Sequence, residues 1–181
     1  MNLLSVDPGP ETCGLMILDV DSFPPPVVEQ SADVPVADVL AIIVAGKWHG
    51  WAFSQVAAER VVSYRQGVGS ETFETIEVYG RIWDRCETNG VPFTCISRKE
   101  VKARIGLQTS AKMPQVNEVV RLTYPRSGGG KKPQVGTKGK PGPLYGVKDH
   151  AWAALGVGLA WCLEREREQR AKELAALKAG A

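Results

Sequence analysis

The chain has 181 residues, of which 44% are hydrophobic and 23% charged, a composition typical of one ordinary globular domain. It contains neither an apolar run long enough to span a membrane nor the basic start and apolar stretch of a signal peptide, so we expect a cytoplasmic protein without membrane contact. Four scattered cysteines without a C-x-x-C pair argue against a zinc site and a disulfide framework.

Charge is segregated along the chain, although the net charge is only +2. Residues 1–97 carry 13 acidic side chains against 5 basic ones, whereas residues 98–148 carry 12 basic side chains against 2 acidic ones. An acidic centre beside a basic surface is what a nucleic-acid enzyme needs, although a chance cluster of surface lysines would give the same count.

The first third of the chain predicts a β-meander followed by a helix. Residues 2–7 and 13–20 are short apolar runs joined by a Pro-Gly turn, which indicates a hairpin. A third strand is expected to begin at Val27, after three consecutive prolines. The apolar spacing over 36–46 fits an amphipathic helix.

Strands and helices then alternate. The apolar run 51–62 predicts a buried strand, and 71–88 predicts a helix with a broad, partly aromatic apolar face. A short strand over 92–96 leads into Ser97, which forms a capping-box pattern with Glu100 and predicts a short helix.

The last third predicts two helices separated by a loop. A helix is expected over 112–124, and the Gly-, Pro- and Lys-rich stretch 125–147 has the composition of a flexible loop. The segment 148–178 is expected to be helical, apolar at first and charged beyond residue 163. We therefore predict an α/β domain over 1–163, a mixed five-stranded sheet flanked by helices, with a charged helical tail over 164–181.

Asp7 stands at the end of an apolar strand, directly before a Pro-Gly turn. A charge at this place is unfavourable unless it is paired, and a metal ion is one usual partner. An Asx hydrogen bond within the turn is the equally simple alternative.

Glu59 lies inside an otherwise apolar strand, where an ionised carboxylate needs a specific partner. Its neighbour Arg60 is a poor partner, because consecutive strand residues point to opposite faces. A salt bridge to another strand is the alternative to a metal ion.

Asp149 opens the last helix, where on its own it would serve as an ordinary N-terminal acid. Together with Asp7 and Glu59 it gives three carboxylates, which could bind two Mg²⁺ ions, or Mn²⁺ in their place, for phosphodiester hydrolysis. We predict these three residues as metal ligands and catalytic residues.

Several motifs resemble the RuvC-type Holliday-junction resolvases of the RNase H-like superfamily, including their bacteriophage members. Residues 5–15 (SVDPGPETCGL) resemble the first strand and turn of that family, I-D-P-G-x-x-x-x-G, and residues 58–61 (AERV) resemble the strand with its second acid. Residues 101–104 (VKAR) with 111–116 (AKMPQV) resemble its V-K-x-x…A-x-K-x-Q-V stretch, the most discriminating match.

This resemblance implies an RNase H-like fold and a homodimer that binds a four-way DNA junction and makes two symmetric Mg²⁺-dependent nicks, in recombination, repair or phage DNA processing. The helix 71–88 would lie at the dimer interface, although ordinary core packing explains its apolar face equally well. The protein would act in the cytoplasm of a bacterial cell or of a host cell infected by a phage.

The C-terminal acids depart from the family pattern, which has two acids three residues apart. Asp149 is the single carboxylate near that place: aligned with the second acid it leaves Gly146 at the first position, and aligned with the first acid it leaves Trp152 at the second. A third alignment puts His150 and Ala153 at the two positions. We therefore choose Asp149, with His150 as a metal ligand or acid–base helper, or else as a simple surface histidine.

The basic segment supplies the expected DNA contacts. Lys112 is the main candidate for a phosphate contact or for transition-state stabilisation, and Tyr64 is a candidate for base stacking. Further expected DNA-binding residues are Lys99, Lys102, Arg104, Lys131, Lys132, Lys138 and Lys140.

Two other functions fit the same sequence. One is a different RNase H-like nuclease that acts on flaps, hybrids or other branched DNA. The other is a non-catalytic DNA-binding relative, which would have no use for a buried Glu59.

Overall fold

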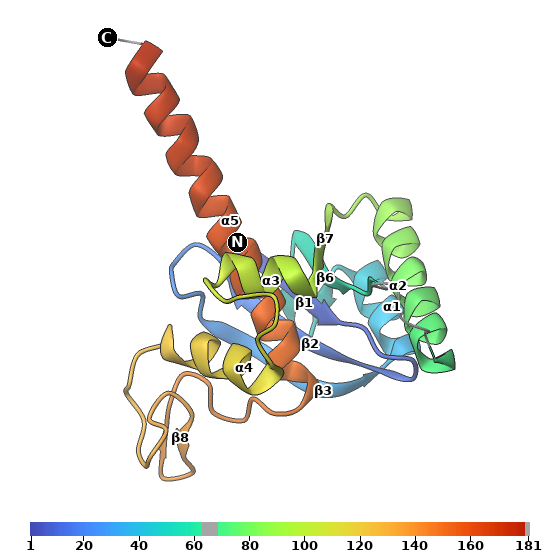
Figure 1. The fold of residues 1–181 in the computed structure, drawn as a ribbon. Helices are drawn as coiled ribbons and strands as arrows, with labels where there is room; N and C mark the ends of the chain where they lie inside the picture. The colour runs from blue at the N-terminus through green and yellow to red at the C-terminus, as the bar shows by residue number, and fades with distance from the viewer. Residues whose placement is uncertain (63–68, 180–181) are drawn as a thin grey trace.

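Five strands form one mixed sheet in the order β3-β2-β1-β6-β7 (Figure 1). The strands β1 (Asn2–Asp7), β2 (Thr12–Asp19) and β3 (Val27–Pro35) form an antiparallel meander. On the other side of β1, β6 (Gln55–Arg60) and β7 (Phe93–Ser97) are parallel to it and to each other. The computed structural model describes residues 1–62 and 69–179, and its sheet confirms the predicted mixed five-stranded architecture.

Helices cover both faces of this sheet. One face packs against α1 (Val36–Ala45) and α2 (Ser70–Thr88), and the other against α5 (His150–Ala179), which is flanked by α3 (Arg98–Arg104) and α4 (Met113–Leu122). Side chains of β1 alternate accordingly: Leu4 and Val6 join the core under α1 and α2, whereas Leu3 joins the core under α5. The two sides of β1 are both apolar, which makes it a fully buried central strand.

Helix α5 is longer than the body of the protein that it covers. Its first half is buried against the sheet, while the side chains of residues 167–178 are all exposed and this half projects away from the rest of the chain (Figure 1). Up to residue 179, the predicted charged tail is the end of α5. No helix within the described part of the chain is long and apolar enough to cross a membrane.

The predicted strand over 51–62 is interrupted. Residues 51–52 form β5 (Trp51–Ala52), which pairs with β4 (Lys47–Trp48) in a separate small hairpin. The N–H of Phe53 then donates to the carbonyl of Gly46, and β6 starts at Gln55. The continuous apolar run therefore contains two separate strands, β5 and β6. Apolar composition alone could not reveal the break between them, because both strands are rich in apolar side chains.

The segment 125–147, called the glycine-rich module below, consists mostly of turns and bends, as expected of a loop, but it is packed and contains a short hairpin that the sequence analysis did not predict. It contains the hairpin of β8 (Gly136–Thr137) and β9 (Lys140–Pro141), and the buried side chain of Gln134 accepts a hydrogen bond from Arg121. A Cβ atom on Gly128 would lie 2.6 Å from the carbonyl oxygen of Pro133. Here glycine permits close backbone packing, whereas its frequency in the sequence indicated flexibility.

Candidate active site

Two buried carboxylates lie at the ends of adjacent parallel strands. Val6 pairs with Ala58 in the β1–β6 register, so the next residues, Asp7 and Glu59, follow at the same edge of the sheet. Asp7 is 7% exposed and Glu59 is 6% exposed. Both line one cavity of about 300 Å³, which the Pro8–Pro10 turn helps to enclose.

Burial makes ionisation of both acids less favourable. It raises the pKa of Asp7, and a hydrogen bond from His150 and the charge of Arg98 offset only part of this effect. Burial likewise raises the pKa of Glu59, where Arg98 acts in the opposite direction and the charge of Asp7 in the same direction. A bound cation would make ionisation of both buried acids favourable again. Two interacting acids with raised pKa values are therefore what we expect of a metal site.

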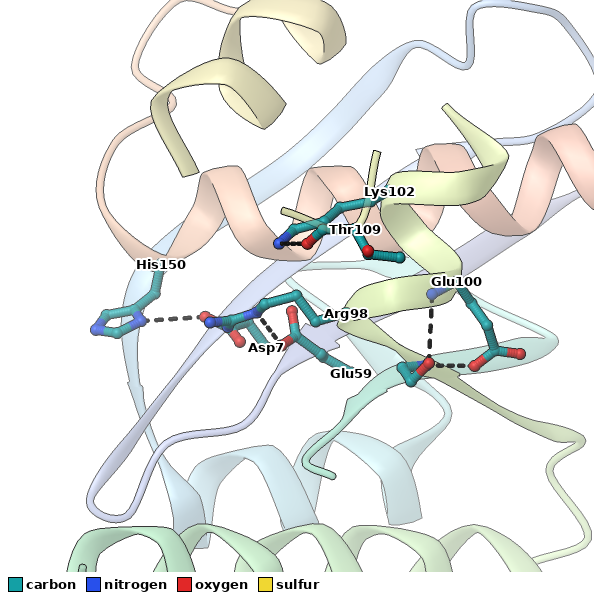
Figure 2. Close-up of polar contacts among 8 residues, drawn as sticks. Asp7, Glu59, Arg98, Glu100, Lys102, Thr109 and His150 are labelled. Atoms are coloured by element: carbon teal, nitrogen blue, oxygen red, sulfur yellow. Dashed lines mark hydrogen bonds and ion pairs between the residues drawn. The ribbon is translucent and has the colours of Figure 1, made fainter. Parts of the chain in front are cut away.

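His150 is brought to the site by the packing of α5 on β2. Its Nδ1 lies 3.1 Å from Oδ2 of Asp7 (Figure 2). Gly14 pairs with Asp7 in the β1–β2 register, and a Cβ atom on it would lie 2.3 Å from the carbonyl oxygen of His150. Because Gly14 has no side chain, His150 can pack directly against β2 beside Asp7.

Arg98 is the partner of Glu59 that the sequence analysis did not identify. Its Nε donates to Oε1 of Glu59 over 2.6 Å, and Figure 2 shows its guanidinium extending from α3 toward both carboxylates. The β6–β7 register places Arg98: Arg60 pairs with Ser97, so the residue after Ser97 begins α3 at the carboxylate edge of the sheet. The expected capping box of Ser97 and Glu100 is present and sets this helix start.

The start of α2 forms another wall of the cavity. Glu71, Thr72 and Thr75 line it together with Asp7 and Glu59. Glu71 is therefore the third carboxylate of this cavity, and the sequence pattern gave no reason to single it out from the other acids of a charged helix.

Asp149 and Lys112 do not line the cavity. Asp149 is exposed and has a φ of 42°, outside the helical region, so α5 begins one residue later than expected. Lys112 is exposed at the N-cap of α4. Their roles as metal ligand and as phosphate contact stay predictions.

The expected DNA-binding residues of α3 differ in their surroundings. Lys99 is exposed. Nζ of Lys102 donates to the carbonyl of Thr109 over 2.9 Å. Arg104 is ion-paired with Glu164 at 3.4 Å and, more loosely, with Glu100, which makes it the least available of the three for phosphate. Tyr64 lies outside the described residues.

The glycine-rich module lies beside α4 (Figure 1) and carries four exposed lysines. They lie on its turns and at its hairpin: Lys131, Lys132, Lys138 and Lys140. Glu118 on α4 interacts with Lys132, and the hydrogen bond with Arg121 lowers the pKa of Glu118. The module therefore presents positive charge on a folded support.

A mixed sheet of this order with helices on both faces, and acids at the ends of its two central parallel strands, defines an RNase H-like α/β fold. Among solved structures, the chain is similar to RuvC of Thermus thermophilus, with a TM-score of 0.65 and 18% identity over 93% of this chain and 97% of that one. It is similar to the same protein in complex with a Holliday-junction substrate, with a TM-score of 0.65 and 19% identity over 93% and 96% of the two chains. No protein-family model and no curated protein matches the sequence. The likeness shows that the fold is that of RuvC, as the sequence motifs predicted.

Proposed function

We propose that this protein is a divalent-cation-dependent endonuclease that resolves four-way DNA junctions. The observation that carries the proposal is the pair of buried carboxylates, Asp7 and Glu59, which face one cavity together with His150. Two buried acids at this place contribute nothing to the hydrophobic core, and their ionised forms are unfavourable unless positive charge compensates both of them. The RuvC fold supports the choice of a junction as the substrate.

The donor atoms of the site fit Mg²⁺ or Mn²⁺, since two carboxylates supply the oxygen ligands that these ions prefer. Within the described residues, no three His, Cys, Asp or Glu side chains are grouped closely enough to hold an ion without further ligands. Mg²⁺ is commonly bound by one or two carboxylates plus substrate phosphates, so we propose that DNA completes the ligand set. Two such ions would supply the charge that activates water and stabilises the leaving oxygen of a phosphodiester.

The side chains of the site have distinct parts in this proposal. Asp7 and Glu59 hold the cations, at positions that the sheet fixes. An ionised Asp7 accepts the hydrogen bond from Nδ1 of His150, which leaves Nε2 of a neutral ring with a free lone pair. At Nε2, on the side of the ring that faces away from Asp7 (Figure 2), His150 could accept a proton or bind a cation. The third acid is Asp149, as the sequence predicts, or Glu71, which lines the cavity.

A homodimer would let one enzyme make two symmetric nicks, and α2 supports its formation. Phe73, Ile76 and Trp83 are 57%, 41% and 52% exposed along one side of this helix. Beside them, α2 and the edge strand β7 enclose a largely apolar groove of about 600 Å³. We propose that this surface packs against a second copy of the chain.

One observation favours a second candidate function, which is junction binding without cleavage. The Arg98 guanidinium already compensates Glu59, so the carboxylate pair has a protein partner without any ion. In that case the basic surface would bind DNA and the acids would only support the fold.

Cleavage assays separate these functions. Labelled four-way junctions, flaps, duplexes and RNA–DNA hybrids are incubated with the protein in Mg²⁺ or in EDTA. Paired symmetric nicks in the junction alone, lost in EDTA and regained with Mg²⁺, are the expected result. Nicking of flaps or hybrids instead would indicate a different nuclease, and junction binding without any nick would contradict both nuclease functions.

Variants identify the acids that act. Asp7→Asn and Glu59→Gln are each expected to reduce cleavage by more than about 100-fold, since removing a ligand costs at least as much as removing a supporting hydrogen bond. Glu77→Gln, an exposed acid on α2, is the matched control. Comparing Glu71→Gln with Asp149→Asn shows which of the two is the third acid, because only that change should abolish cleavage.

A further inference from the structure

The Arg98–Glu59 ion pair has an uneven exposure that a merely structural salt bridge would not need. The side chain of Glu59 is 9% exposed, whereas that of Arg98 is 52% exposed. Arg98 also lines the cavity shared by Asp7, Glu59 and His150. The positive charge therefore lies at the solvent side of the acid pair, where an incoming cation or phosphate would arrive.

The guanidinium is only partly used by this contact. Its Nε binds Glu59, and within the part of the chain that the structure describes the two terminal nitrogens of Arg98 have no hydrogen bond of their own. Arginine can bind a carboxylate and a phosphate at once, because its five N–H groups point in fixed, separate directions. The free edge is thus suited to a phosphodiester oxygen.

The two buried carboxylates line the cavity, so a phosphate can approach them only if a positive charge lies nearby. Without a compensating positive charge, ionised Asp7 and Glu59 would repel a phosphodiester as it approached, and burial of the site strengthens this repulsion. Arg98 interacts with both acids, since its charge favours the ionised form of each.

We propose that Arg98 is the resident counter-charge of the carboxylate site: it competes with divalent cations for Glu59 and offers its free edge to the DNA phosphate. This inference rests on the proposed function and deepens it. Arg98 is a positioning residue for the substrate phosphate, and it sets how strongly the empty site attracts metal ions.

The proposal predicts effects of opposite sign on two ligands. Arg98→Gln should bind Mn²⁺ about tenfold more tightly than the unmodified protein when DNA is absent, because one repelling charge is removed at short range. In the Asp7→Asn background, where cleavage is blocked, the same change should weaken junction binding about tenfold in EDTA, as expected when a charged hydrogen bond to phosphate is removed. A purely structural role would weaken both or change neither.

The measurements are isothermal titration with Mn²⁺ alone and junction binding by fluorescence anisotropy. Arg170→Gln is the matched control, because Arg170 forms an ion pair with Glu166 on the projecting half of α5 and does not line the cavity. Arg98→Lys keeps the charge and should fold even where the glutamine variant does not; it should retain the original Mn²⁺ affinity and bind the junction more weakly.

The outcomes distinguish the two proposals. Equal Mn²⁺ affinity of the unmodified protein and folded Arg98→Gln overturns the role of Arg98 and leaves the metal site intact. Absence of Mn²⁺ binding in both proteins overturns the metal site itself, and this inference with it. Unchanged junction binding by Arg98→Lys contradicts the contact of the free edge with phosphate.

Discussion

Gly14 of β2 lies directly against His150, the first residue of α5, with space for a hydrogen atom but not for a methyl group. A Cβ atom at Gly14 would be 2.3 Å from the carbonyl oxygen and 2.8 Å from the Cβ atom of His150. Since Gly14 is also the strand partner of Asp7, this contact brings the histidine beside the first acid.

We therefore expect Gly14→Ala to disturb both the fold and the site. The added methyl group meets backbone, which cannot turn aside as a flexible side chain would, so the loss of stability should be about 3 kcal/mol, at the upper end for overpacking. Thermal unfolding measures this loss, and the cleavage assay should show reduced activity. Gly139→Ala is the control, because a Cβ atom there has no neighbour within 4 Å. Equal stability of the two variants would show that α5 can shift without cost.

The capping box of α3 predicts a specific pH dependence. The hydrogen bond from Ser97 lowers the pKa of Glu100 below its ordinary value of 4.5. A lowered folded-state pKa means that its contribution to stability is present above about pH 4.5 and disappears as the pH falls through the folded-state value. Glu100→Gln should therefore flatten the acid side of the stability curve, measured by urea unfolding between pH 7 and pH 3.

Ser97→Ala provides the matching test, because it removes the Ser97 hydroxyl and keeps both the carboxylate and the backbone N–H that donates to it. It should cost about 1 kcal/mol at neutral pH, as for other helix caps that are removed, and flatten the same part of the curve. If Ser97→Ala left the pH dependence unchanged, the lowered pKa of Glu100 would have to come from the backbone N–H of residue 97 or from Arg104, and not from the Ser97 hydroxyl.

The lysines of the glycine-rich module should contribute to DNA affinity. Replacing Lys131, Lys132, Lys138 and Lys140 by glutamine is expected to weaken junction binding. Because each lysine that neutralises a phosphate releases counterions, the slope of log K against log salt should fall by about 0.9 for every such lysine that is replaced. Fluorescence anisotropy between about 50 and 200 mM salt, a range over which binding of this kind weakens strongly, gives this slope.

The control removes the same charge elsewhere. Glutamine in place of Arg167, Arg170, Lys172 and Lys178 on the projecting half of α5 lowers the net charge by the same amount. If both quadruple variants bound the junction equally weakly, the net charge of the protein, rather than the module, would account for binding.

The exposed apolar side of α2 should determine the oligomeric state. Phe73→Lys combined with Ile76→Lys is expected to convert a dimer into a monomer, because two charges would be buried at the proposed interface. Light scattering after size exclusion measures the mass. Leu122→Lys, on the exposed side of α4, is the control and should leave the mass unchanged. A monomeric unmodified protein at high concentration would contradict the proposed dimer.

The sequence predicted the features that depend on local patterns. The hairpin around Asp7, the buried strand around Glu59 and the capping box at Ser97 all rest on periodicity or turn chemistry, and the structure contains all three. The features that the sequence did not predict depend on what lies beside each residue in space. Arg98 is 39 residues from Glu59, and nothing in its own surroundings along the chain distinguishes it from Lys99.

The packing of the glycine-rich module is another feature that could not be predicted from local sequence. Its composition is that of a loop, and only the close approach of backbone segments, such as Gly128 to Pro133, reveals that it is packed. Asp149 shows a further limit, because a position at the start of a helix does not specify where the side chain lies. Asp149 has a φ of 42° and does not line the cavity, whereas the next residue, His150, does.

The hydrogen bond between Asp7 and His150 joins residues that are 143 positions apart. During synthesis, the first acid leaves the ribosome long before Glu59, Arg98 and His150. The carboxylates therefore cannot be assembled with their histidine until more than four-fifths of the chain has been made. A nascent or truncated chain that ends before α5 would carry both acids without His150 and without the packing of α5 on β2, so the site described here would be complete only when translation is nearly finished.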